Sequence, residues 1–313
     1  MISSIAYGPV PSRRLGRSLG INNIPPKRCS YSCVYCQLGR TKNIQIKREV
    51  LYEPLHLVRS VREKVEQLRK NGELIDYLAF VPDGEPTLDS NLGKHLELLR
   101  ALGIKLAVIT NASMVWREDV QQELQKADWV CLKVDAVTVD IWKSVNRPHK
   151  KLRLDTILDG MLRFARSFLG ELTSETMLIK GINDTTREID KIAGFLAELN
   201  PAKAYLSIPI RPPAERIEPA TEITLNAAFQ IFSSKLSIVE YLIGYEGNAF
   251  ASTGNAVDDL LSITAVHPMR KDAVVELLNR TGSSWDVVHT LIADGSLLEL
   301  EYQGKKFYAR KLT

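Results

Sequence analysis

Short apolar runs alternate with longer amphipathic stretches from residue 18 to about residue 242. Short runs bounded by turn residues are typical of buried strands, whereas apolar residues at every third or fourth position are typical of helices that cover a sheet. The pattern therefore predicts six strand-helix units around a parallel sheet, which is an α/β fold. Six units are too few to close an eight-unit barrel.

The strands are expected where β-branched and aromatic residues gather. They are Ser18–Asn22, Ile75–Phe80, Lys105–Thr110, Trp129–Val134, Glu175–Ile179 and Ala204–Ile208. The helices expected between them are Leu55–Arg69, Asn91–Leu102, Glu118–Lys126, Leu154–Phe168 and Glu188–Leu199. Pro212 and Pro213 interrupt the pattern, after which a helix at Leu225–Leu236 and an edge strand at Ser237–Ile243 are expected.

The rest of the chain has a different pattern. Gly244–Asn255 is rich in turn residues and predicts a linker. Three helical segments follow, at Val257–Thr264, Lys271–Arg280 and Ser284–Ala293, and then two strands at Leu297–Tyr302 and Lys306–Arg310 that turn at Gln303 and Gly304. This order is that of a winged helix–turn–helix, so we expect two domains, residues 1–250 and 251–313.

Composition predicts a soluble globular protein, and the N-terminus predicts a cytoplasmic one. The chain has 313 residues, of which 45% are hydrophobic and 25% charged. No segment approaches the ~18 uninterrupted apolar residues of a membrane span. Met1–Ala6 lacks a basic region followed by an apolar one, so a signal peptide is not expected.

The formal charge of +4 is unevenly distributed. Residues 1–50 hold nine Lys or Arg and a single acid, Glu49. This bias predicts an anionic ligand, a nucleic acid or an acidic protein partner, although a solvated surface explains it equally well. Residues 252–313 hold seven basic and eight acidic residues, which argues against DNA and favours peptide or protein docking there.

Three of the four cysteines are closely spaced: Cys29, Cys33 and Cys36 form a CxxxCxxC pattern just after the first predicted strand. Disulfides are rare in a reducing compartment, so the grouping indicates a metal centre. Three thiolates on an iron–sulfur cluster leave one iron open for a reacting molecule. The alternatives are a zinc knuckle, which would need a fourth Cys or His nearby, and three unrelated thiols. Cys131 has no companion and is expected to be a small buried apolar residue.

The spacing, with Tyr35 directly before its last cysteine, resembles the radical S-adenosylmethionine (radical SAM) superfamily. The opening Gly8–Gly16 and the later Gly84–Leu88 resemble a branch of it grouped near the wyosine tRNA-modification synthases and the glycyl-radical activases. The resemblance covers roughly residues 7–250. It implies a partial (β/α)6 barrel with a [4Fe–4S] cluster on the three cysteines, whose open iron binds SAM. SAM cleavage then yields a 5′-deoxyadenosyl radical that abstracts hydrogen from the substrate.

The resemblance also assigns residues to SAM. Gly84, Glu85 and Pro86 correspond to the GGE motif that binds the SAM amino group, although Asp83 replaces the usual first Gly or Ser. A plain Asp-Gly turn is the alternative. Asn111 ends the third strand and resembles an activase segment that lies close to SAM.

Strand periodicity points further residues toward the barrel interior. In the fourth strand, Lys133 and Asp135 share a face with Trp129 and Cys131, opposite the apolar Val130, Leu132 and Val134. Lys133 and Asp135 are therefore expected to reach SAM or the substrate, or else to be surface charges at the strand end. Ser207 and Arg211, on and after the sixth strand, are further candidates that face inward, and Lys180 begins a turn expected next to the nucleoside of SAM. Asn146–His149 is expected to be a loop over the same edge, where it would touch the substrate or be solvated.

Three functions remain open at this point. The first is a radical SAM enzyme that acts on a protein or peptide, with the winged helix helping to present it. The second is an RNA-modifying radical SAM enzyme, motivated by the basic first fifty residues. The third is a non-enzymatic iron–sulfur regulator. An acidic flavodoxin or ferredoxin is the expected electron donor.

Overall fold

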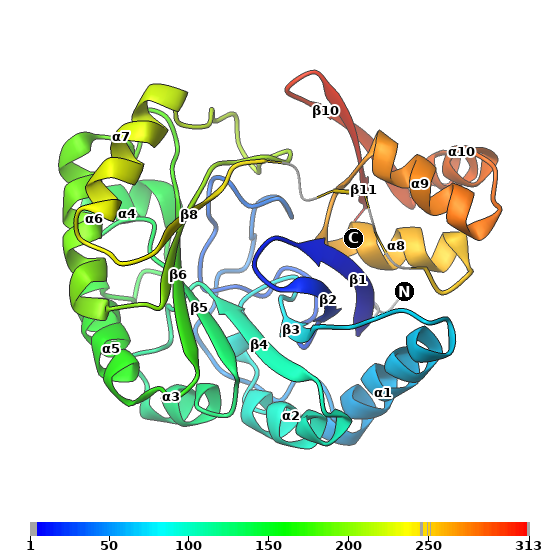
Figure 1. Cartoon of the computed structure of the whole chain (residues 1–313), viewed down its shortest axis with the longest axis horizontal. Coiled ribbons are helices and arrows are strands. Elements are labelled where there is room, and N and C mark those ends of the chain that lie inside the picture. Colours follow the sequence, from blue (N-terminus) through cyan, green and yellow to red (C-terminus); the bar gives the residue numbers. More distant parts are fainter. Residues whose placement is uncertain (1–4, 245–246, 249, 251, 312–313) are drawn as a thin grey trace.

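A curled eight-stranded sheet forms the centre of the computed structural model, which describes residues 5–244, 247–248, 250 and 252–311 (Figure 1). The strands follow one another in chain order across the sheet. They are β1 (Ala6–Ser12), β2 (Gly16–Ile21), β3 (Tyr77–Phe80), β4 (Lys105–Thr110), β5 (Trp129–Lys133), β6 (Glu171–Met177), β7 (Lys203–Ser207) and β8 (Val239–Leu242). β1 runs antiparallel to β2, and all later neighbours are parallel. The predicted α/β partial barrel is confirmed.

Helices cover the convex side of this sheet (Figure 1). They are α1 (Pro54–Lys70), α2 (Leu92–Leu99), α3 (Glu118–Leu124), α4 (Val139–Asn146), α5 (Leu154–Ser167), α6 (Thr186–Leu199) and α7 (Glu222–Ser233), with short 3-10 turns at Pro86–Leu88 and Arg100–Leu102. Val130 and Leu132 pack in the large core under these helices, whereas Trp129 and Cys131 belong to a small cluster on the other face of the strand. The predicted two faces of β5 are therefore confirmed.

In the barrel, one strand and one α-helix were not predicted. β1 contains Pro9 and Pro11, which argue against a strand, but β1 is an edge strand and has an irregular register between Tyr7 and Val10. α4 ends at Asn146, the first residue of the predicted loop, so the loop is confined to the residues after it. β6 begins four residues earlier than expected because its first half includes buried Thr173 and Ser174, which do not read as a strand core.

The C-terminal part contains the predicted helices and strands. They are α8 (Ala256–Val266), α9 (Lys271–Thr281), α10 (Asp286–Ala293), β10 (Leu297–Tyr302) and β11 (Lys305–Arg310), and the short β9 (Met269–Arg270) pairs with β11. These elements have a hydrophobic core of their own, which already includes Phe250 and against which Val10 of β1 packs. Residues 245–246, 249 and 251 of the predicted linker lie outside the described residues.

This C-terminal module, residues 252–311, is attached to the barrel at several points. Lys64 of α1 pairs with the buried Asp259. The Tyr302 hydroxyl donates to the Pro209 carbonyl at 3.0 Å, and Gln37 Nε2 donates to the Val266 carbonyl at 2.6 Å. Within the described residues, no helix is long and apolar enough to cross a membrane.

Candidate active site

The three clustered cysteines lie in the long loop between β2 and α1, at the carboxyl edge of the parallel strands. Cys29, Cys33 and Cys36 are free thiols, and all three line one cavity of about 290 Å³. Function in α/β barrels gathers at this edge because successive loops converge there. Six further predicted site residues line the same cavity: Tyr35, Gly84, Glu85, Asn111, Lys133 and Arg211. Asp83, directly before Gly84, lines it as well.

Gly84 joins the cysteine loop to the end of β3. Lys27 N donates to the Asp83 carbonyl at 2.9 Å, and Glu85 N donates to the Arg28 carbonyl at 3.0 Å. A Cβ atom on Gly84 would lie 1.7 Å from the Arg28 carbonyl oxygen. Only glycine therefore permits this close approach, which fixes the backbone directly before Cys29.

The Glu85 carboxylate is buried and held by the protein's own donors. It accepts from the hydroxyls of Thr87 and Thr110, each at 2.6 Å, and from Asn111 N at 2.8 Å. Burial raises the pKa of Glu85, and these hydrogen bonds oppose that rise. Glu85 thus ties the end of β4 to the Gly84 turn, while Pro86 lies buried behind it at the start of a 3-10 turn.

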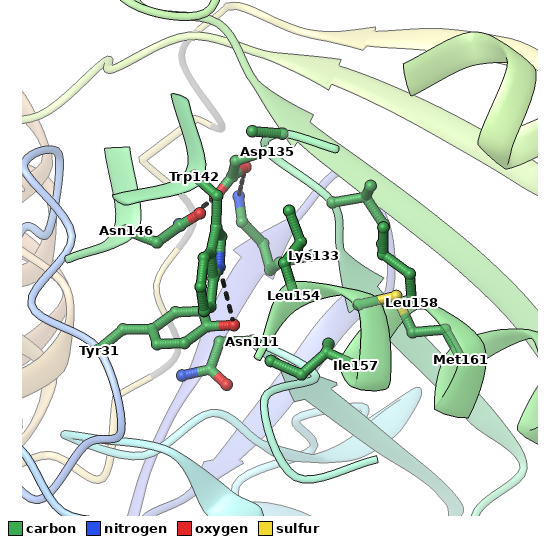
Figure 2. Close-up of a pocket in the computed structure, with 12 residues that line it drawn as sticks. Tyr31, Asn111, Lys133, Asp135, Trp142, Asn146, Leu154, Ile157, Leu158 and Met161 are labelled. Atoms are coloured by element: carbon green, nitrogen blue, oxygen red, sulfur yellow. Dashed lines mark hydrogen bonds and ion pairs between the residues drawn. The ribbon is translucent and has the colours of Figure 1, made fainter. Parts of the chain in front are cut away.

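Two asparagine side chains donate to the cysteine sulfurs. Asn111 Nδ2 lies 3.5 Å from Cys29 Sγ and also donates to Ser30 Oγ at 3.0 Å. Asn146 Nδ2 lies 3.4 Å from Cys33 Sγ and donates to Asp135 Oδ2 at 2.8 Å (Figure 2). Hydrogen bonds of this kind, from residues that do not themselves bind the metal, orient the metal ligands and adjust the affinity and reactivity of the metal centre.

Asp135 is the centre of a buried hydrogen-bond network. It accepts from the Tyr35 hydroxyl and, at 2.9 Å, from Met177 N, and Lys133 Nζ lies 3.6 Å from it. Figure 2 shows Asp135 between Lys133 and Asn146. The predicted pair is therefore brought together, but Asp135 positions Tyr35 and Asn146, whereas Lys133 faces the cavity.

Lys133 forms an ion pair with Glu175, which the sequence did not predict as a site residue. Its Nζ lies 3.0 Å from Glu175 Oε1, which Ser207 Oγ also contacts at 2.9 Å, and Arg14 pairs with the same carboxylate. Burial opposes ionisation of Glu175, yet Lys133 and Arg14 lower its pKa to about 2. The sequence did contain a signal for this ion pair. Glu175 lies among the alternate residues of β6 that face the barrel interior, and Arg14 lies in the Gly8–Gly16 segment that carries the family resemblance.

Four predicted site residues are not among those that line the cavity: Pro86, Asp135, Ser207 and Lys180. Asp135 and Ser207 contact residues that do line it, Tyr35 and Glu175, whereas Lys180 lies apart from it. Its side chain is about half exposed and pairs with Glu218 at 2.6 Å. The Gly-led turn thus directs this lysine to solvent. The His149 side chain in the predicted loop makes a local contact: its Nδ1 accepts a hydrogen bond from Lys151 N at 3.2 Å.

The residues present fit an iron–sulfur cluster. Burial raises the pKa of all three thiols, that of Cys33 to about 12, so they need bound cations to become thiolates. Within the described part of the chain, no three His, Cys, Asp or Glu side chains converge on a position for a single metal ion. All three thiols line one cavity, as three ligands of a shared cluster would.

Comparisons agree with this site. The sequence profile of the radical SAM superfamily matches residues 23–195. The UPF0026 protein of Methanocaldococcus jannaschii is 49% identical over 312 residues, which cover 99% of this chain and 97% of the relative. A solved radical SAM methyltransferase from Sphaerobacter thermophilus superposes with a TM-score of 0.55 at 15% identity, over 72% of this chain and 66% of that one. The structure of TYW1 with a bound lysine-pyruvate adduct superposes with a TM-score of 0.54 at 17% identity, over 71% of this chain and 74% of that one.

The half-barrel and the three-cysteine loop define a radical SAM enzyme. The chain belongs to the radical SAM superfamily and, within it, to the UPF0026 family. The predicted [4Fe–4S] cluster and SAM are the cofactors that this superfamily uses. Membership supports an enzyme and not the regulator alternative.

Proposed function

We propose that this enzyme uses the 5′-deoxyadenosyl radical to abstract hydrogen from a protein or peptide. When bound and reduced, the cluster supplies the electron that cleaves SAM into methionine and the radical. In this proposal, Tyr35, held by Asp135, and Asn111, held next to Glu85, orient SAM beside the three cysteines. Lys133 and Arg14, both paired with Glu175, face the interior where the substrate would bind.

The observation that favours a protein substrate over RNA is the pairing of the basic N-terminal residues. Most of them contact acids or carbonyl groups of this chain: Arg14 with Glu175, Arg17 with Asp76, Arg28 and Lys47 with Glu49, Arg40 with Glu215, Arg48 with Asp119 and Glu123, and Lys27 with the Gly39 carbonyl. Phosphate binding needs lysine and arginine charges that are available to the ligand. The local charge of +8, nine basic residues less Glu49, is therefore partly neutralised within the protein, while Arg40 and Lys47 keep exposed side chains.

Reductive cleavage of SAM is the first test. The protein is reconstituted anaerobically with iron and sulfide, then given dithionite and SAM, and 5′-deoxyadenosine is measured by chromatography. We expect formation by the native chain and, because one cluster ligand is lost, none by Cys33→Ala. A Cys131→Ala control should retain the activity, since Cys131 lies in the apolar cluster of the barrel interior. A native chain that holds a cluster without cleaving SAM would contradict the proposal.

Substrate class is tested by the stimulation of SAM cleavage. A cell extract is divided and treated with protease or with ribonuclease before addition. Stimulation that survives ribonuclease and is lost after protease treatment supports a protein or peptide. The reverse result would favour the RNA-modifying alternative.

The C-terminal module and the electron donor enter the proposal as well. We propose that the module is a winged helix–turn–helix that docks protein rather than DNA. An acidic flavodoxin or ferredoxin would meet the more exposed basic side chains near the cluster loop, Arg40 and Lys47, whose side chains are 68% and 80% exposed. Reduction should then slow as ionic strength rises, and a rate that ignores salt would contradict this donor.

A further inference from the structure

Lys27 has an unusual backbone conformation directly before the first cluster cysteine. Its φ of 65° lies in the left-handed region, which costs a residue with a side chain roughly 1–2 kcal/mol. Lys27 N donates to the Asp83 carbonyl at 2.9 Å, so a contact with the segment after β3 holds the residue in this conformation. Residues with strained backbone cluster at functional sites, which makes the position of this side chain informative.

The Lys27 side chain reaches the turn that follows Cys36. Its Nζ donates to the Gly39 carbonyl at 2.8 Å, and Gly39 N donates to the Cys36 carbonyl at 3.0 Å. Lys27 is partly buried and lines the same cavity as Cys29, Cys33 and Cys36. The ammonium group is thus fixed at the edge of the cluster site by the cysteine loop itself.

The strongest negative neighbour of the Lys27 ammonium is a cluster ligand. Its side-chain hydrogen bond goes to a neutral carbonyl, and within the described part of the chain no Asp or Glu forms an ion pair with it. Burial lowers the pKa of Lys27, and Cys36, then Asp83 and Cys29, oppose that fall. Burial likewise raises the pKa of Cys36, and Lys27 opposes that rise. Lys27 and Cys36 are therefore close enough for their charges to interact.

We propose that Lys27 raises the reduction potential of the cluster by holding a positive charge next to Cys36. When the electron donor gives up one electron, the cluster and its three thiolates gain one negative charge. A partly buried ammonium group stabilises this added charge more than an exposed lysine does, because water and salt screen it less. Lys27 thus acts on the step before SAM is cleaved. The inference does not depend on the proposed substrate, since it concerns reduction of the cluster alone.

The reduction potential is measured in the full-length protein after anaerobic reconstitution, by a redox titration followed by electron paramagnetic resonance in the absence of SAM. Lys27→Gln removes the charge but keeps an N–H donor, whereas Lys27→Arg keeps the charge. We expect Lys27→Gln to make reduction about tenfold less favourable, which is a fall of about 59 mV for one electron. Lys27→Arg should stay near the native potential.

A further variant, Lys27→Gly, separates the effect of charge from the effect of folding. Glycine adopts a φ of 65° without steric cost, so this variant should fold at least as well as the native chain. Its potential should nevertheless fall as far as that of Lys27→Gln, because both variants lose the ammonium group. Lys42→Gln, which removes an exposed lysine from the same loop, is the matched control and should keep the native potential.

All potentials are compared at equal iron content. An unchanged potential in Lys27→Gln or Lys27→Gly would overturn the proposal and leave the side chain with its structural contact to Gly39 alone. An equal fall in Lys27→Arg would overturn it as well, because the shape of lysine rather than its charge would then set the potential. None of these titrations contains a peptide or an RNA, so the proposed substrate is tested separately, by the stimulation of SAM cleavage.

Discussion

Asn146 connects a cluster ligand to the Asp135 network. Its single amide nitrogen donates both to Cys33 Sγ and to Asp135. Hydrogen bonds to sulfur stabilise the more negative, reduced state of a cluster. The side chain therefore acts on the cluster although it lies outside the CxxxCxxC pattern.

Asn146→Leu should lower the reduction potential of the cluster, because the donor to Cys33 is lost while the side-chain volume is kept. The rate of 5′-deoxyadenosine formation should fall about tenfold, the lower end for the loss of such an outer contact. A redox titration followed by electron paramagnetic resonance measures the potential. Asn279→Leu, on the exposed face of α9, should leave it unchanged. An unchanged potential in Asn146→Leu at equal iron content would show that the contact is only structural.

Gly84→Ala should separate the Gly84 turn from the cysteine loop, since the new Cβ would lie 1.7 Å from the Arg28 carbonyl. We expect a loss of about 1–3 kcal/mol in the free energy of unfolding and reduced iron binding. Urea denaturation and iron analysis measure the two effects. Gly194→Ala is the matched control, because nothing lies near its Cβ position in α6, and it should stabilise by about 0.5–1 kcal/mol. Normal iron content in Gly84→Ala would contradict the proposed role.

Sequence alone predicted those site residues whose chemistry is local. Cys29, Cys33 and Cys36 are close in sequence, and Lys133 follows from the two-residue period of a strand. Asn146 was expected only as a loop residue over the site edge and Glu175 only as a strand residue, because their partners Cys33 and Arg14 are 113 and 161 positions away. The place of Lys180 outside the cavity could not be predicted, because sequence does not show in which direction a turn points its side chain.

At the scale of elements, the start of α8 depends on a buried acid. Asp259 accepts from Ser252 Oγ at 2.8 Å and from Thr253 N at 2.7 Å, and Lys64 of α1 pairs with it at 3.6 Å. The same carboxylate thus closes the turn before the helix and attaches the module to the barrel. Its neighbour Asp258 is exposed.

Asp259→Ala should leave these donors unsatisfied and lower the free energy of unfolding by about 1–3 kcal/mol. Amide hydrogen exchange should increase in α8 before it increases in β3–β7, because the module loses an attachment that the barrel core does not need. Asp258→Ala should change neither quantity appreciably. Uniform exchange across both parts of the chain would argue against a docking role for Asp259.

Helices and parallel strands were the easiest elements to predict, since their periodicity follows from burial on one or two faces. β1 was missed because its prolines suit only an edge strand, and sequence does not reveal which strand will be the edge. The apolar pattern along α8, α9 and β10 predicted the module itself. Its position against the barrel depends on contacts between residues far apart in sequence, such as Tyr302 and Pro209, which are 93 positions apart.

For the whole molecule, the distribution of charge matters more than its sum. The basic first fifty residues are spread over ion pairs with acids from several parts of the chain, and the Arg48 side chain is only 7% exposed between Asp119 and Glu123. The positive charge of this segment is thus partly compensated by acids from elsewhere in the chain.

Binding to transfer RNA should accordingly be weak and should depend little on salt. A protein that makes six to ten phosphate contacts loses about 10³-fold or more in affinity between 50 and 200 mM salt. We expect less than about a tenfold loss here, measured by filter binding. A steep salt dependence would revive the RNA-modifying alternative.

The contact between Gln37 and Val266 joins residues 229 positions apart. During synthesis, the cysteine loop therefore leaves the ribosome long before the wall that encloses it. A cluster inserted at that stage would lie open to oxygen and to competing thiols. Maturation should thus be ordered in time, with the polypeptide finished first and iron delivered to a cavity that is already complete.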